Sequence, residues 1–267
     1  MIANLVPDEL WDRIAPLMLA RPVRRYRRPG RLPVPDRAAL AGVVYVLCKG
    51  VAWRDVPASV VGCSGVTAWR RLRDWTETGL WPRMQAALLT ELRRADLLAL
   101  DDCAVDGSHV RAVKGGDHVG PSPVDRARPG SKHHLIVDRH GTPLAVTLTG
   151  GNRHGVTQLL PLLDAVPPIR GLRGRSRHRP RCLYADRGYD FDKYPRQLWK
   201  RGIKPMIARR GIAHGSGLGK VRWVVEHAFA WLHQFKRIRY ERRASLHQGL
   251  LELTCSIICL RRLSRSF

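Results

Sequence analysis

Three acidic residues, widely separated along the chain, have the sequence surroundings of a shared metal-binding site. Asp186 follows the apolar run Leu183–Ala185, and Asp106 follows the apolar run Cys103–Val105. In open α/β sheets, functional sites form outside the carboxyl ends of the strands. Each run therefore predicts a strand that brings its acid to the same edge of a sheet. The third acid, Glu226, lies in a mostly apolar stretch whose spacing predicts a helix.

The predicted helix around Glu226 gathers charged groups on one stripe. At 100° per residue, Arg222, Glu226 and His233 fall within about 40° of one another. Trp223 and Trp231 are expected to contribute to the apolar packing of the same helix. A surface stripe with an ordinary Arg–Glu pair, worth about 0.3 kcal/mol, would show the same spacing. Likewise, each Asp taken singly is equally consistent with a charged turn after a structural strand.

Three converging carboxylates indicate a particular chemistry. They repel one another unless cations neutralise them. A set of oxygen ligands without Cys or His suits Mg²⁺ or Mn²⁺. Two such ions, about 3.5–4 Å apart, activate the attacking oxygen and stabilise the leaving oxygen of a phosphodiester. The three acids together therefore favour phosphoryl transfer on nucleic acid.

The composition predicts a polyanionic partner. The 267 residues include 47 Lys and Arg against 22 Asp and Glu, a formal net charge of +25 at pH 7. Most of these cations are Arg, whose planar fork suits phosphate. The six Cys form no Cys-x-x-Cys pair and are expected to be reduced and buried. Because no signal peptide or membrane-length apolar run is recognisable, we expect a cytoplasmic protein with no membrane partner.

Residues 1–97 are predicted to form a helical domain. A basic turn at residues 21–31 separates its first two helices. Further on, a short helix, a Gly-containing turn and a second, Arg-rich helix have the pattern of a helix-turn-helix. Its Arg70, Arg71 and Arg73 are candidates for DNA contact. Three packed helices with a solvated basic face are the alternative.

Residues 98–267 are predicted to form an α/β domain. The pattern gives three antiparallel strands, a helix, a strand, a helix and a strand, which fits one mixed sheet with flanking helices. Asp138–Gly141 marks the hairpin between the second and third strands. Residues 168–181 form an Arg-rich linker, and residues 220–236 return to a helix.

At this level of detail the chain resembles bacterial insertion-sequence transposases of the IS5 group, within the IS4-like DDE class. The resemblance is carried by the motifs Val105–Ala112, Gly130–His134, Ala185–Asp190 and Arg222-x3-Glu226. It implies an RNase H-like catalytic core whose Asp106, Asp186 and Glu226 hold Mg²⁺, with Mn²⁺ as a substitute. It also implies DNA contacts from Lys132, Arg187, Arg222 and His233.

Three positions depart from the pattern of that class. Gly219 stands where Tyr is expected, and His233 stands where Lys is expected. Gly155 follows His154 at a position where relatives are expected to carry Asp. None of these positions is a predicted metal ligand, so the departures concern the grip on DNA.

The resemblance predicts a complete activity. The protein would bind the inverted repeats at the element ends, hydrolyse phosphodiester bonds and join the freed 3′-OH to target DNA, as a homodimer on double-stranded DNA at the bacterial nucleoid. Two alternatives stay open. One is an inactive or domesticated copy that acts as a DNA-binding regulator, and the other is a metal-dependent nuclease without strand transfer.

Overall fold

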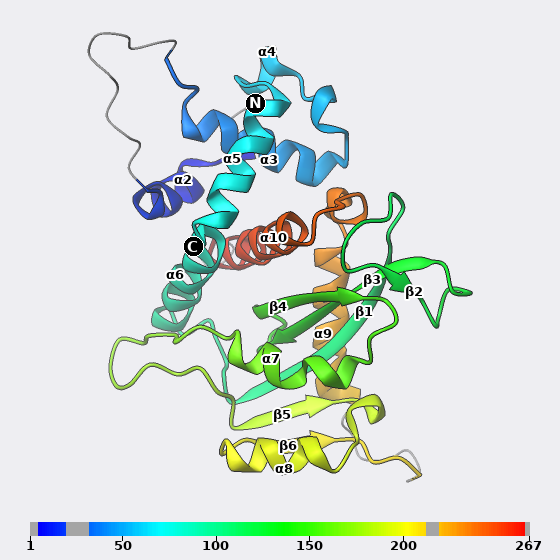
Figure 1. Ribbon diagram of the computed structural model, residues 1–267. Helices are drawn as coiled ribbons and strands as arrows, with labels where there is room; N and C mark the ends of the chain where they lie inside the picture. The colour runs from blue at the N-terminus through cyan, green and yellow to red at the C-terminus, as the bar shows by residue number, and fades with distance from the viewer. Residues whose placement is uncertain (1–4, 20–31, 212–218, 265–267) are drawn as a thin grey trace.

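A computed structural model of the chain describes residues 5–19, 32–211 and 219–264. The basic turn expected at residues 21–31 lies outside them. A mixed sheet forms the lower part of the molecule in Figure 1, and a group of helices lies above it. No helix in the described ranges is long and apolar enough to cross a membrane.

The sheet has six strands around a central β1. These are β1 (Asp102–Arg111), β2 (Gly120–Pro121), β3 (Pro129–Val137), β4 (Pro143–Gly150), β5 (Cys182–Ala185) and β6 (Lys204–Ile207). The long strands lie in the order β4-β3-β1-β5-β6, and β2 pairs with the start of β3. β1, β3 and β4 are antiparallel, whereas β5 and β6 run parallel to β1. This confirms the predicted mixed sheet.

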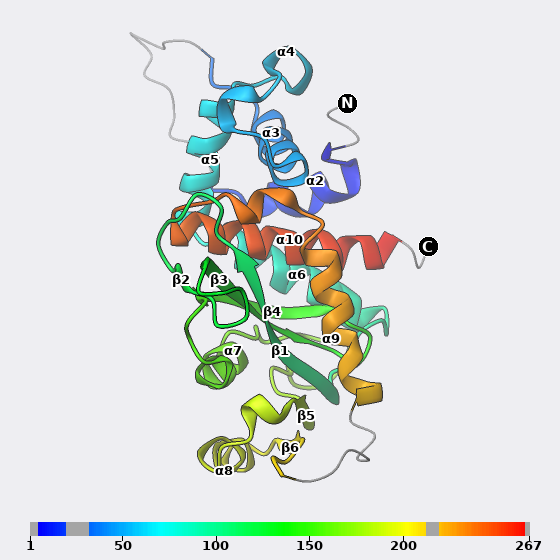
Figure 2. The ribbon, with the colours of Figure 1, turned by 90° about the vertical axis from the view of Figure 1, so that its right-hand side faces the viewer.

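Helices cover both faces of the sheet (Figure 2). One face carries η3 (Gly155–Gln158), α7 (Leu159–Asp164) and α8 (Lys193–Lys200), and the other carries α9 (Gly219–Leu232). α9 packs against β1 and β3 through its buried Val225, Ala228 and Leu232. The helix expected at 220–236 is therefore confirmed in its main part, and η5 (Lys236–Arg239) follows it.

The hairpin predicted at Asp138–Gly141 is held by one buried carboxylate. Asp138 is fully buried and accepts hydrogen bonds from the backbone N–H groups of His140, Thr142 and Ala99. Ala99 belongs to the segment that leads from the helical part into β1. This carboxylate therefore fixes the entry to the sheet against the β3–β4 turn.

The helical part contains the short helix and the Arg-rich helix on which the helix-turn-helix prediction rests. Its helices are α2 (Asp8–Ile14), α3 (Asp36–Lys49), α4 (Ala58–Val61), α5 (Gly65–Glu77) and α6 (Leu80–Arg94). α4 and α5 are the short helix and the Arg-rich helix. Ser64 caps α5 by accepting a hydrogen bond from the Thr67 N–H at 3.2 Å.

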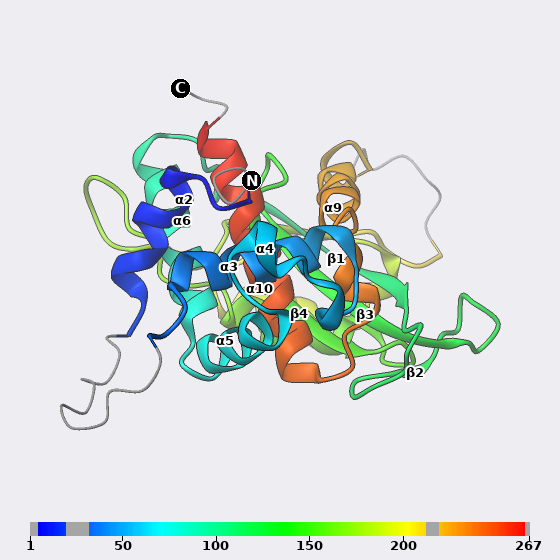
Figure 3. The same cartoon turned by 90° about the horizontal axis from the view of Figure 1, so that it is seen from above.

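The last described helix, α10 (Ala244–Ser264), joins the two parts and is absent from the sequence prediction. It packs against α5 and α6 on one side and β4 on the other, and it lies beneath α3 and α4 when the molecule is seen from above (Figure 3). Leu250, Leu253 and Cys259 on it are fully buried. A helix that is buried around most of its circumference lacks the apolar stripe that reveals an amphipathic helix.

Four neutral histidines lie on or beside β3: His133, His233 and His247 lie where β3, α9 and α10 meet, whereas His134 lies on the other face of β3, with its Nε2 2.8 Å from the Thr149 Oγ1. His133 and His247 approach at 3.0 Å between their Nε2 atoms, and the His233 ring centroid lies 5.6 Å from that of His133. Burial lowers the pKa of His134 to about 3 and the pKa values of His233 and His247 to about 4. Burial also lowers the pKa of His133 well below its ordinary value.

These histidines predict an acid-sensitive fold. The unfolded chain takes up these protons near pH 6.5, whereas the folded chain takes them up only near pH 4 or below. The free energy of unfolding should therefore fall as the pH drops from about 6.5 to about 4. Urea unfolding at about pH 7, 6 and 5 measures this slope, which should be shallower in His247→Gln by up to about 1.4 kcal/mol per pH unit. Equal slopes in the two proteins would contradict the prediction.

Candidate active site

Asp106 lies within β1 and not at its end. We expected the strand to stop at this acid, but β1 continues to Arg111 because its pairing with β3 continues to Gly130. The parallel pairing with β5, in contrast, runs only from Asp102 to Ala104. Asp106 therefore stands just beyond the point where β1 loses its parallel neighbour.

Asp186 directly follows β5 and caps the short turn η4 (Arg187–Tyr189). Its carboxylate accepts a hydrogen bond from the Gly188 N–H at 2.9 Å. A Cβ on Gly188 would lie 3.0 Å from the Asp186 Oδ1, so glycine allows this close turn. Ala104 pairs with Tyr184 in parallel strands. Asp106 and Asp186 each lie two residues beyond this pair, so they stand level with each other.

Asp106 lies close enough to Asp186 and Glu226 for their charges to affect its pKa. Burial raises the pKa of the half-buried Asp106 carboxyl, while the Gly107 N–H, which donates to it at 2.7 Å, acts in the opposite direction. The charges of Asp186 and Glu226 raise the pKa of Asp106 further, and Arg222 lowers it. The Arg222 Nη2 lies 3.5 Å from the Asp106 Oδ2. The fold thus brings four predicted site residues near one another.

Glu226 is the most loosely held of the three acids. It is exposed on α9 and makes no hydrogen bond or ion pair within the described part of the chain. In residues 5–19, 32–211 and 219–264, no three His, Cys, Asp or Glu side chains form a group that could hold a metal ion. The donor chemistry of Asp106 and Asp186 nevertheless fits a hard divalent cation, because both offer carboxylate oxygens at one sheet edge.

Lys132 reaches the same edge from β3. Its Cε lies 2.7 Å from where a Cβ on Gly107 would be, and its Nζ lies 3.4 Å from the equivalent point on Gly155. Burial lowers the pKa of the Lys132 ammonium, and the charges of Asp106 and Asp186 act in the opposite direction. Because Gly107 and Gly155 have no side chains, the Lys132 side chain can pass close to both of them.

Tyr189, in the Ala185–Asp190 motif, was expected from the sequence to face DNA, but the structure buries it beside this lysine and near the acids. Its ring is buried, and its hydroxyl has no hydrogen-bond partner among the described residues. Burial, followed by the charges of Asp106 and Asp186, raises the pKa of Tyr189 well above its ordinary value. Its position in the Arg-Gly-Tyr turn after Asp186 is the only sequence signal for it.

The predicted DNA-contacting residues of α5 lie in the helical part, and their exposure differs. Arg70 is exposed. Arg71 lies 3.5 Å from the Asp36 carboxylate, and Arg73 pairs with Asp74 at 2.8 Å. Of the three, Arg70 is therefore the most available to a phosphate.

The two remaining predicted contacts are Arg187 and His233. Arg187 is half-buried in η4, directly after Asp186. His233 lies just beyond α9, stacked on Phe229 with ring centroids 5.7 Å apart, and its Nε2 is buried without a hydrogen-bond partner among the described residues. Because its pKa is about 4, His233 is neutral at pH 7.

Comparison with known proteins decides the family. Residues 99–259 match the family model described as "Transposase DDE domain", and residues 6–85 match "Putative transposase of IS4/5 family (DUF4096)". The chain belongs to the DDE transposase family. It is 60% identical over 154 residues to a putative transposase for insertion sequence element IS402 of Burkholderia cepacia, covering 57% of this chain and 73% of that protein. The resemblance to IS5-group transposases is confirmed.

The chain is also similar to two further proteins. A 16.2 kDa uncharacterized protein of insertion element IS402 of Burkholderia cepacia is 49% identical over 124 residues, covering 46% of this transposase and 84% of that protein. Among solved structures, the crystal structure of the Mos1 strand transfer complex aligns over 91% of this chain and 78% of that chain. Its sequence identity is 12% and its TM-score is 0.38.

Asp106→Asn should stabilise the transposase while inactivating it. Because burial raises the pKa of Asp106, its charged form opposes folding, and a neutral amide removes that opposition. The gain should be present at neutral pH and disappear below about pH 4, where Asp106 is protonated in both states. DNA cleavage should fall at least about 100-fold.

Thermal unfolding and cleavage of a labelled duplex measure these two effects. Asp192→Asn, at an exposed position, is the matched control and should change neither. An Asp106→Asn protein that is less stable at pH 7 would contradict the assigned electrostatics.

Proposed function

We propose that this DDE transposase binds the inverted repeats at the ends of its element, hydrolyses a phosphodiester bond there and joins the freed end to target DNA. The placement of Asp106 level with Asp186, with Glu226 on the neighbouring helix, is the observation that carries the proposal. The proposed domains are residues 1–97 for DNA binding and residues 98–267 for catalysis, with the basic linker at 168–181.

The proposed reaction has two displacements at phosphorus. In the first, a water oxygen bonds to phosphorus, the bond from phosphorus to the 3′ oxygen breaks, and that oxygen takes up a proton to become the 3′-OH. In the second, this 3′-OH loses its proton and attacks a phosphorus atom of the target. A new phosphodiester forms, and the 3′ oxygen of the target leaves with a proton.

Asp106, Asp186 and Glu226 would hold the divalent ions, Mg²⁺ or Mn²⁺, that stabilise the negative charge at phosphorus. The N–H groups of Gly107 and Gly188 orient the two Asp carboxylates, which favours a fixed position for them. The exposed Glu226 is free to rotate towards them, and Arg222 offsets the charge of Asp106 before DNA arrives.

The DNA contacts follow from the positions of the cations. Lys132, Arg187 and Arg222 surround the acids and would bind phosphates near the cleaved bond, while Arg70, Arg71 and Arg73 of α5 would bind the inverted repeat at a distance from it. His233 would contribute only as a neutral hydrogen-bonding group at pH 7. Two element ends must be brought together for joining, so we propose a homodimer on double-stranded DNA at the bacterial nucleoid.

The decisive assay uses the full chain, Mg²⁺ or Mn²⁺, and a labelled duplex carrying the DNA that flanks the coding region. The wild type should cut this duplex and join it to a second DNA. Asp186→Ala and Glu226→Ala should bind the duplex but lose both steps. Variants as active as the wild type would refute the proposed triad, and cutting without joining would indicate a nuclease.

Lys132→Gln tests the proposed phosphate contact at the acids. Loss of one ion pair with phosphate should reduce the slope of log affinity against log salt by about 0.9 and weaken binding of the duplex. Lys204→Gln, at an exposed position of β6, is the matched control and should keep the wild-type slope. Equal slopes for all three proteins would remove Lys132 from the DNA contacts.

A further inference from the structure

A cavity of about 450 Å³ lies at the junction between the helical part and the sheet. Its walls come from η2 (Trp53–Asp55) and α5 on one side, and from the loop after β1 and the segment between α9 and α10 on the other. The lining residues are Trp53, Trp69, Gly116, Asp117, Arg237, Tyr240, Glu241, Arg242 and Arg243. We call this space the junction cavity.

One buried carboxylate fixes the backbone that carries Arg242 and Arg243. The Glu241 side chain is 6% exposed, and its Oε1 accepts hydrogen bonds from the backbone N–H groups of Arg242 and Arg243 at 3.1 and 3.4 Å. Its Oε2 accepts a hydrogen bond from the Arg237 Nη2 at 3.0 Å. The Arg242 carbonyl oxygen in turn accepts one from the Asp117 N–H at 2.8 Å. Both arginines therefore start from fixed backbone positions.

The side chains of these two arginines extend from this support to the surface. Arg242 is exposed, and its side chain makes no hydrogen bond, ion pair or ring contact with the described residues. Arg243 is also exposed, and its guanidinium lies over the Trp69 ring at 5.0 Å. Stacking uses the face of a guanidinium and leaves the N–H groups at its edge able to bind an anion. A buried acid that fixes two exposed cations favours a role in binding.

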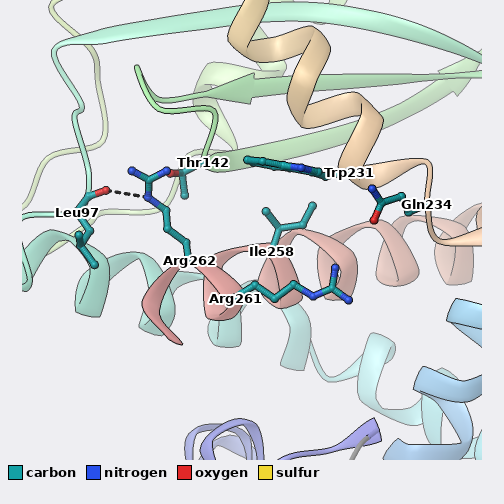
Figure 4. A pocket seen from close by; sticks show the side chains of 7 residues that line it. All are labelled: Leu97, Thr142, Trp231, Gln234, Ile258, Arg261 and Arg262. Carbon is teal, nitrogen blue, oxygen red and sulfur yellow. Dashed lines mark hydrogen bonds between the residues drawn. The ribbon is translucent and has the colours of Figure 1, made fainter. Parts of the chain in front are cut away.

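The arginines of another cavity, between α9 and α10, are placed differently (Figure 4). That cavity, of about 350 Å³, is lined by Leu97, Thr142, Trp231, Gln234, Ile258, Arg261 and Arg262. Arg262 donates to the Leu97 carbonyl oxygen at 3.2 Å, and Arg261 lies over the Phe235 ring at 5.4 Å. Its other lining residues are uncharged. The junction cavity, where Arg242 has no side-chain partner among the described residues, is therefore the stronger candidate for an anion site.

The charges around the junction cavity also favour an anion. Three arginines and two acids line it, which gives a net charge of +1. Glu241 is paired with Arg237, and Asp117 accepts a backbone hydrogen bond. The exposed Arg70 directly follows Trp69 on α5, which adds a further cation next to the cavity. Phosphate is the anion whose oxygens match the edge of a guanidinium, and the net charge of +25 favours phosphates on a polyanion.

We propose that the junction cavity binds a backbone phosphate of the DNA that α5 contacts, through the guanidinium groups of Arg242 and Arg243. Glu241 is the positioning residue for both. The inference rests on the proposed function, which supplies the DNA. α5 borders the cavity on one side, and the segment that follows the helix of Glu226 borders it on the other, so both parts of the molecule hold the same duplex. A phosphate contact of this kind fixes the register of the protein on the duplex without reading its sequence.

Binding of the labelled duplex that carries the flanking DNA tests the contact, in chelator so that no cleavage occurs. The double variant Arg242→Gln with Arg243→Gln removes two exposed guanidinium groups. Loss of one phosphate contact should reduce the slope of log affinity against log salt by about 0.9, and the affinity at about 0.1 M salt should fall about 10-fold. Arg196→Gln with Lys200→Gln, at exposed positions of α8 far from the helical part (Figure 2), removes the same charge and should keep the wild-type slope.

Glu241→Ala separates positioning from charge. The variant loses an acid, so charge alone would strengthen its binding of DNA. Because the N–H groups of Arg242 and Arg243 lose their acceptor, its affinity for the duplex should instead fall several-fold. Glu241→Gln keeps a side-chain oxygen that can accept these N–H groups and should restore most of the affinity. Glu77→Ala, at an exposed position of α5, removes the same charge and should bind at least as tightly as the wild type.

The outcomes distinguish this inference from the proposed function. A wild-type salt slope in the double arginine variant would overturn the phosphate contact, even if the wild type cuts and joins DNA. A reduced slope in a protein that binds the duplex but does not cut it would support the contact and refute the proposed reaction. If Glu241→Ala is unfolded by circular dichroism, the arginine variant alone decides the inference.

A free anion is the other source of the same chemistry. Titration with inorganic phosphate, followed by tryptophan fluorescence, tests it, because Trp53 and Trp69 line the junction cavity. A response that the double arginine variant loses, together with an unchanged duplex slope, would assign the cavity to free phosphate and overturn the inference.

Discussion

The structure depends on the short parallel pairing of β1 with β5. It joins three residue pairs and then stops, which leaves Asp106 and Asp186 level with each other beyond its end. Burial and the charge of Asp186 both raise the pKa of the half-buried Asp106 carboxyl. One backbone N–H for each acid and the guanidinium of Arg222 offset part of that penalty. The remaining negative charge at this edge of the sheet therefore favours the binding of cations.

α10 and two stacked arginines connect the helical part with the sheet. Arg237 lies over the Trp53 ring at 5.3 Å, and Arg243 lies over the Trp69 ring at 5.0 Å. Trp69 belongs to α5, the Arg-rich helix of the helix-turn-helix pattern. Each such contact contributes on the order of 1 kcal/mol. α5 is thereby held at a fixed position relative to the sheet.

Periodicity and strand-end acids were sufficient to predict the succession of β1, β3, β4, β5 and β6 along the chain, the hairpin, and the position of Asp186 directly after its strand. They failed where tertiary contacts decide. β1 passes Asp106 because β3 continues to pair with it, and no local signal reports that pairing. α10 is apolar on most sides, so its sequence lacks a stripe. Trp223 is a large apolar residue of the kind expected in a core, and only its position on α9 shows that its side chain is exposed to solvent. The reason for glycine at position 155 likewise appears only in the fold, where Lys132 of a strand distant in sequence lies beside it.

α10 also has a consequence for the order of synthesis. It fills the space between α5, α6 and β4, and its side chains complete the core on both sides. Neither the helical part nor the sheet can therefore close its core until residues 244–264 have left the ribosome. The sheet that carries Asp106 and Asp186 therefore reaches its final packing only after residues 244–264 have been translated.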